Sequence, residues 1–185
     1  MLANTTQFKT FSSDVQVVGA AVLALVAGME DFKETGLQIL AKQGIIAPKE
    51  GEWYPGQSYL DAYREIAKTI GSYRLTRIGR KVPDHALWPP HIDSIEKALA
   101  SIDVAYHMNH RGGEVGHYRF KRTGERSCTM ECDNPYPCPF DTGLIEATAN
   151  KFAPPRTLVA VRHESDDRQP CRQKGGERCI YYISW

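Results

Sequence analysis

The chain has 185 residues, which is enough to bury a hydrophobic core within one domain. Lys and Arg number 23 against 22 Asp and Glu, so the net charge is close to zero. A chain without a basic excess is not expected to bind nucleic acid or anionic membranes through general electrostatic attraction. The longest apolar stretch, residues 15–29, is shorter than the roughly 20 residues that span a bilayer. We therefore expect a cytoplasmic protein with no membrane insertion and no nucleic-acid partner.

Helical patterns dominate the first 70 residues. Ser12 or Ser13 is a suitable N-cap for a helix over residues 15–28, in which apolar side chains occupy nearly every face. Such a helix must be covered, by the core or by a second copy of the chain, and we therefore predict a homodimer. Two further helices are predicted over residues 32–43 and 58–70, and each ends at a glycine.

The second part of the chain, residues 71–185, mixes strands and helices. Polar and apolar residues alternate as in half-buried strands at residues 73–78, 115–121, 127–131, 157–163 and 180–185. Helices are predicted over residues 93–106 and 140–152. Most turns between the strands are too short for parallel crossovers. We predict a single α+β domain over residues 1–185, in which N-terminal helices precede a helix-flanked, largely antiparallel sheet.

The cysteines are confined to the last third of the chain, at positions 128, 132, 138, 171 and 179. Gly175 and Gly176 can turn the backbone between Cys171 and Cys179 and so bring the two sulfur atoms together. Zinc takes about four nitrogen, sulfur or oxygen ligands in a tetrahedral arrangement. The other available donors are Cys128, Cys132, Cys138, His163 and Asp167. We predict zinc as the cofactor, bound at a C-terminal corner of the fold.

Three other interpretations of the cysteines stay open. Disulfides would leave one cysteine over, and the chain opens with no secretory signal. Buried, unreactive thiols are an alternative, although charged residues, prolines and glycines surround these cysteines. An iron–sulfur cluster also needs thiolates, but none of the ferredoxin spacings occurs.

Two segments together carry a family resemblance. The sequence Cys138-Pro-Phe-Asp-Thr-Gly143 opens a helix, and Cys171-x7-Cys179 precedes an aromatic terminal strand. This pattern resembles the 4-vinyl reductase-type ligand-binding domain, which includes phenol-sensing modules of bacterial activators and is distantly similar to TRAPP subunits. The resemblance is clearest over residues 70–185. It implies a zinc site at Cys138, Cys171 and Cys179, with Asp167, His163 or Cys132 as the fourth ligand, because Arg168 stands where an acidic ligand is expected.

The same resemblance implies an apolar pocket between the helices and the sheet. Candidate ligand-binding residues are Tyr73, Trp88, Tyr106, His107 and His110, which offer aromatic faces and polar tips. The histidines near residue 107 would alternatively complement the C-terminal dipole of a helix. Tyr73-x-x-x-Arg77 resembles the Tyr-x-Ser-x-Arg element of haem nitric-oxide sensors, although Leu75 replaces the serine.

The sequence contains none of the common catalytic motifs, such as a nucleophile elbow, a phosphate-binding loop or a His-Glu-x-x-His helix. A binding module is therefore favoured over an enzyme. We predict a zinc-containing sensory module that binds a small apolar or aromatic ligand and signals through a separate partner protein. The alternative is a protein that binds haem or another tetrapyrrole, or a reductase acting on a vinyl-bearing tetrapyrrole.

Overall fold

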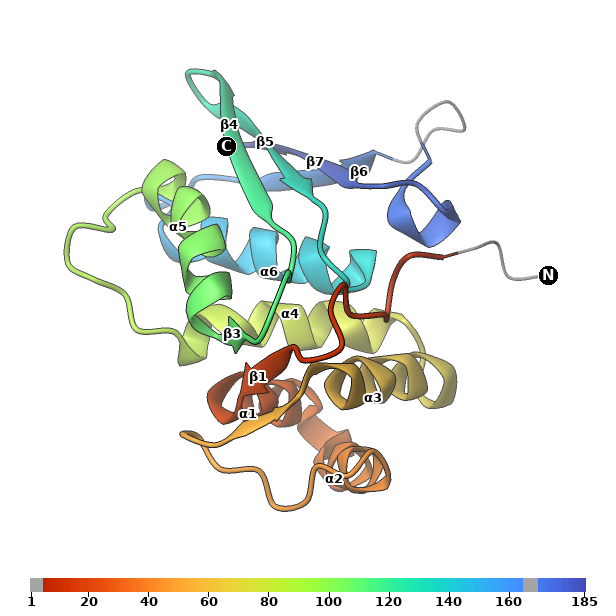
Figure 1. Cartoon of the computed structure of the whole chain (residues 1–185). Helices are drawn as coiled ribbons and strands as arrows, with labels where there is room; N and C mark the ends of the chain where they lie inside the picture. Colours follow the sequence, from red (N-terminus) through yellow and green to blue (C-terminus); the bar gives the residue numbers. More distant parts are fainter. Residues whose placement is uncertain (1–4, 165–169) are drawn as a thin grey trace.

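The computed structural model describes residues 5–164 and 170–185, which form a stack of helices beneath a four-stranded sheet (Figure 1). Helices α1, α2 and α3 lie farthest from the sheet, α4 and α6 lie in the middle, and α5 flanks one side. The helices are α1 (Gly19–Gly28), α2 (Lys33–Lys42), α3 (Gly56–Thr69), α4 (Tyr73–His85), α5 (Ile95–Met108) and α6 (Cys138–Lys151). This arrangement confirms the predicted α+β class.

The large sheet is antiparallel throughout, as predicted, and has the strand order β4-β5-β7-β6. Its strands are β4 (Tyr118–Gly124), β5 (Ser127–Cys132), β6 (Ala160–Glu164) and β7 (Cys179–Ser184). Buried and more exposed residues alternate along β5 and β7, because one face of each strand packs on the core. Cys132 pairs with Cys179 across the two central strands, at the end of the sheet nearest the start of α6.

A second, small sheet joins three distant segments in the order β2-β1-β3. Its strands are β1 (Gln16–Val18), β2 (Trp53–Pro55) and β3 (His110–Arg111). The predicted first helix is therefore too long, since its first residues form β1 and α1 begins only at Gly19. The reason is that the β-branched residues at 15, 17 and 18 suit a strand, and β2 and β3 supply its partners.

Helix α4 replaces the strand that was predicted at residues 73–78, so this prediction is wrong. The first residues of this segment alternate, but Leu75 and Ile78 are three residues apart and, with Gly79 and Pro83, form one buried face of a helix. Close packing against α6 decides between the two patterns. A Cβ atom on Gly79 would collide with the carbonyl oxygen of Phe140, and one on Gly143 with that of Thr76. Backbones that approach this closely require glycine.

Helix α1 is covered within the chain, mainly by α4 and α2. Val22, Leu25 and Val26 are at most 4% exposed, and each residue from 15 to 29 is buried or half-buried. The homodimer was predicted because the apolar side chains of this helix had to be covered. The fold covers them within one chain, so this argument for a homodimer no longer holds. No helix in the described ranges is both long enough and apolar enough to cross a membrane.

Candidate functional site

A mostly apolar cavity of about 100 Å³ lies among the helices and the edge of the sheet. Ala21 and Tyr59 approach it from α1 and α3, and Phe140, Leu144 and Thr148 approach it from α6. The remaining wall comes from the end of α4, the connection after it, helix α5 and the segments that follow: Val82, Pro83, Ala86, Trp88, Ile102, Ala105, Tyr106, Asn109, His110, Tyr118 and Tyr136. Residues from both halves of the chain therefore build one chamber.

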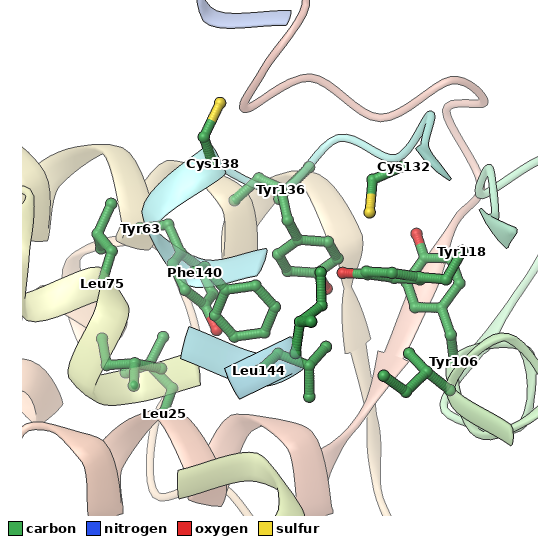
Figure 2. Packing of buried hydrophobic residues seen from close by; sticks show 14 of the residues in the cluster. Leu25, Tyr63, Leu75, Tyr106, Tyr118, Cys132, Tyr136, Cys138, Phe140 and Leu144 are labelled. Carbon is green, nitrogen blue, oxygen red and sulfur yellow. The ribbon is translucent and has the colours of Figure 1, made fainter. Parts of the chain in front are cut away.

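Aromatic residues that line the cavity pack against one another, most of them edge to face. Figure 2 shows Tyr106, Tyr118, Tyr136 and Phe140 among the packed buried side chains. Tyr136 stacks on Phe140 with ring centroids 5.0 Å apart, and it also meets Tyr59, Tyr106 and His110. Such pairs favour offset or perpendicular contacts, because the face of each ring is electron-rich and its edge is electron-poor. The result is a wall of apolar faces whose hydroxyl groups can reach a guest.

His110 provides the basic nitrogen of this wall. Its Nδ1 lies 2.7 Å from the carbonyl oxygen of Tyr106, and its Nε2 lies 2.8 Å from the hydroxyl of Tyr136. A carbonyl oxygen only accepts hydrogen bonds, so Nδ1 carries the proton and Nε2 accepts from Tyr136. Burial lowers the pKa of His110 to about 4, which keeps the ring neutral. A neutral imidazole with Nδ1–H held by a carbonyl is the form that binds a metal through Nε2.

Thr148 adds an unsatisfied polar atom to the same cavity. The side chain lines the cavity and is 0% exposed, yet its Oγ1 has no hydrogen-bond partner among the described residues. A buried hydroxyl without a partner costs roughly 1–3 kcal/mol. A guest with a hydrogen-bonding group would remove this cost, so Thr148 indicates where a polar atom of the guest would lie.

We expect Thr148→Val to raise the free energy of unfolding of the ligand-free protein by about 1 kcal/mol, because it removes the unpartnered hydroxyl and keeps the shape. Thr142→Val is the matched control on α6, since Thr142 Oγ1 donates to the carbonyl oxygen of Cys138 at 2.9 Å. That variant should lose stability. Urea denaturation of both proteins checks the prediction, and equal losses would contradict it.

A buried carboxyl group lies behind the cavity wall. Asp141, on α6, is 1% exposed, and its Oδ1 accepts a hydrogen bond from the hydroxyl of Tyr118 at 2.6 Å. Burial raises the pKa of Asp141 to about 7, although the hydrogen bonds from Tyr118 and Asn134 act in the opposite direction. The carboxyl group therefore holds its proton to a much higher pH than an exposed aspartic acid does.

The late cysteines form a second constellation, at the start of α6. The donor atoms of Cys138, His163, Cys171 and Cys179 all lie within 4.8 Å of one another. Cys138 Sγ lies 3.5 Å from Cys179 Sγ and 4.0 Å from Cys171 Sγ. Two sulfur atoms bound to one tetrahedral ion at about 2.3 Å would be about 3.8 Å apart, so the spacing suits a common ion. The side chain of Cys138 is directed away from the aromatic wall (Figure 2).

Two further features belong to this thiol–imidazole cluster. The buried Nε2 of His163 has no hydrogen-bond partner among the described residues, while its ring stacks on Tyr181. A hydrogen bond with Cys179, together with burial, raises the pKa of the Cys138 thiol. All five cysteines are free thiols. Cys132 is buried on β5 but is not part of the cluster, and Asp167 lies outside the described residues.

The chain matches no family model and no curated protein. Solved structures do match it. An H-NOX protein from S. oneidensis has a TM-score of 0.66 and 11% identity, with 90% of this chain and 95% of that chain covered. An H-NOX protein from K. algicida, with unliganded Fe(II), has a TM-score of 0.63 and 14% identity over the same shares. The chain has the H-NOX fold. Another structure, described as probing haem distortion in the H-NOX family, has a TM-score of 0.65 and 15% identity, with 90% and 94% covered.

The comparison corrects two predictions. The assignment to the 4-vinyl reductase-type domain is wrong, because whole-chain matches are to H-NOX structures. A cysteine before a helix and a late cysteine pair are local features, and they did not identify the fold. Zinc as the cofactor is also wrong, because the cofactor named for the matching H-NOX structures is haem or its Fe(II) ion. The predicted zinc corner is therefore not supported. Cys138, His163, Cys171 and Cys179 remain a cluster of side chains that could bind a metal ion.

The predicted ligand-binding residues divide into two groups. Trp88, Tyr106 and His110 line the cavity, whereas Tyr73 and His107 do not. Tyr73 is 56% exposed on α4, so the haem-sensor element suggested by Tyr73 and Arg77 lies away from the cavity. The main residues missed were Tyr59, Tyr118, Tyr136 and Thr148. The high number of tyrosines was the available signal, but it did not indicate which ones meet.

Proposed function

We propose that this chain is a sensor domain whose cavity binds a flat, mostly apolar molecule, with haem as the first candidate and His110 as its contact. The observation that carries the proposal is the neutral His110 ring, with Nδ1–H held by Tyr106 and Nε2 directed to Tyr136 at the cavity wall. The fold supports it, since the matching H-NOX structures are described by haem or its iron.

The side chains of the cavity suit a haem, but the cavity itself is too small to hold one. Nε2 of His110 would hold the iron once the Tyr136 hydroxyl releases it, and the aromatic wall would pack on the ring. Bound haem would supply an iron with an open coordination position for a small molecule. The cavity of about 100 Å³ is smaller than the roughly 300–1,000 Å³ of typical ligand sites. Its wall must therefore open to admit a porphyrin.

The connection between α4 and α5 forms part of the cavity wall at the surface. Ala86 and Trp88 line the cavity there, while Leu87 between them is 98% exposed. Trp88 is held by a 2.9 Å hydrogen bond from Nε1 to the carbonyl oxygen of Pro83 and by ring contact with Phe152. No Lys or Arg in the described part of the chain lines the cavity, so the cavity wall there would offer no cation to the carboxylates of a haem.

A small phenol is the second candidate, and the cavity volume favours it. A single aromatic ring needs less space than a porphyrin, and its hydroxyl could replace that of Tyr136 as the donor to His110 Nε2. Thr148 Oγ1 offers a second polar contact. Both candidates use the same residues, so binding data must separate them.

A thermal-shift comparison separates the two candidates. Haem or a set of simple phenols is added to the purified chain, to His110→Ala and to the control His107→Ala, whose ring does not line the cavity. We expect one class to raise the melting temperature of wild type and of His107→Ala in a concentration-dependent way, and to leave His110→Ala unchanged. Stabilisation of all three proteins alike, or of none, would refute the proposed site.

Three further proposals accompany this function. The chain acts as one domain, because Ala21 and Tyr59 from the N-terminal part share the cavity with residues of the C-terminal part. Its signal passes to a separate protein.

Cys138, His163, Cys171 and Cys179 form a donor set for a thiophilic metal ion, whose uptake would release protons from the thiols.

A further inference from the structure

A second group of metal-ligand types lies on the outer side of α5, away from the cysteines. It consists of Asp103 and His107, which are one helical turn apart, and His117, which precedes β4. Their donor atoms all lie within 4.8 Å of one another. We propose that these three side chains bind one divalent transition-metal ion.

The distances suit shared coordination. His117 Nδ1 lies 3.4 Å from one carboxylate oxygen of Asp103, and His107 Nδ1 lies 3.6 Å from the other. Ligands that are each about 2.1 Å from one tetrahedral ion lie about 3.4 Å apart. The imidazole rings face each other at a tilt of 40°, with centroids 5.0 Å apart. Two imidazoles and one carboxylate form a donor set used for iron, nickel, copper and zinc ions.

The backbone holds the carboxylate in place. Tyr118 N–H donates to Asp103 Oδ1 at 2.7 Å, and this outer contact fixes one oxygen while leaving the other toward His107. His117 is held through its own N–H, which donates to Asp133 Oδ1 at 2.8 Å. Oriented ligands lose less entropy when an ion binds, and contacts of this kind typically change metal affinity 10- to 100-fold.

The carboxylate of Asp103 favours a cation. Asp103 makes its described ion pairs only with the two histidines, so no Lys or Arg in the described ranges neutralises it directly. The nearby carboxylate of Asp133 is paired with Arg119 at 2.7 Å. His107 Nδ1 also lies 2.8 Å from the carbonyl oxygen of Asp103, and binding through this atom would break that contact. The cost is small, because His107 is exposed and water can replace the ring there.

An ion at this site would tie the end of α5 to the start of β4. The residues next to two of the ligands, Tyr106 and Tyr118, line the cavity. The site would therefore brace one wall of the cavity from outside. This proposal stands on the three side chains alone and does not depend on the identity of the guest.

The test uses Ni²⁺ alone, added in small amounts to chelator-treated protein with labelled histidines. Paramagnetic broadening in NMR spectra reports each imidazole separately. Binding of Ni²⁺ at the cysteine cluster would be recognised because it broadens the ring signals of His163. We expect the ring signals of His107 and His117 to broaden at substoichiometric Ni²⁺, before those of His85 and His91, which are exposed and outside the group.

Variants supply the second measurement. His117→Ala should weaken Ni²⁺ binding, read from broadening of His107, by at least about 10-fold. His91→Ala is the matched control, and it should leave that broadening unchanged. The rings of His91, His107 and His117 are all at least partly exposed, so both variants are expected to fold. Equal broadening of all surface histidines, or equal affinity in the two variants, would overturn the proposal.

Discussion

Gly143→Ala is expected to lower the free energy of unfolding by about 1–3 kcal/mol, although alanine is the better helix former. The added methyl group would collide with the backbone carbonyl oxygen of Thr76, which no side-chain rotation can relieve. Helices α4 and α6 would have to move apart, and α6 carries Phe140, Leu144 and Thr148 of the cavity wall. Urea denaturation measures the loss.

Gly51→Ala is the control for this prediction. A Cβ atom on Gly51 would meet no atom within 4 Å, and this glycine is exposed. The substitution should leave stability unchanged or raise it slightly, because alanine restricts the unfolded chain. Equal stability of the two variants would show that α4 and α6 do not pack as closely as described.

Stability should fall with rising pH through the ionisation of Asp141. Its pKa is raised to about 7 in the folded chain from 3.8, so the unfolded chain loses this proton first. Below pH 4 the carboxyl group is neutral in both states and costs nothing. Between pH 4 and pH 7 only the unfolded state ionises, so unfolding becomes progressively easier. Above pH 7 the cost is constant, at roughly 4 kcal/mol or less.

The comparison of wild type with Asp141→Asn isolates this effect, since other acidic groups change stability in both proteins alike. The stability of the variant relative to wild type should rise between pH 4 and pH 7 and level off above pH 8. Asp93→Asn is the control, because Asp93 is exposed beside Lys97. A pH-independent difference between wild type and Asp141→Asn would show that the carboxyl group is not shifted in the fold.

Local patterns predicted much of the fold. Helices α2 and α3 were predicted close to their observed bounds, because their apolar spacing is regular and a glycine follows each. Helix α4 was missed, because its alternating start also suits a strand. What decides the outcome is the close approach of Gly79 on α4 to Phe140 on α6, and of Gly143 on α6 to Thr76 on α4, between residues far apart in the sequence. Such contacts have no local signal.

The candidate sites were predictable to different degrees. Spacing paired Cys171 with Cys179, and the family resemblance added Cys138; the structure brings these three together with His163, one of the alternatives for the fourth ligand. His110 was named for the cavity, but its tautomer depends on Tyr106 and Tyr136, and only the folded chain shows both contacts. The unpartnered hydroxyl of Thr148 has no sequence signal, because a helical threonine can equally bond the carbonyl oxygen four residues earlier or face solvent.

A haem titration followed by absorption spectroscopy tests the central claim, contact between His110 and the guest, most directly. Haem is added stepwise to the purified chain, to His110→Ala and to His107→Ala. We predict a sharpened Soret band that saturates at one haem per chain in wild type and in His107→Ala, and that is lost or shifted in His110→Ala. An identical saturating band in all three proteins would contradict the role of His110, and free-haem spectra throughout would exclude haem as the guest.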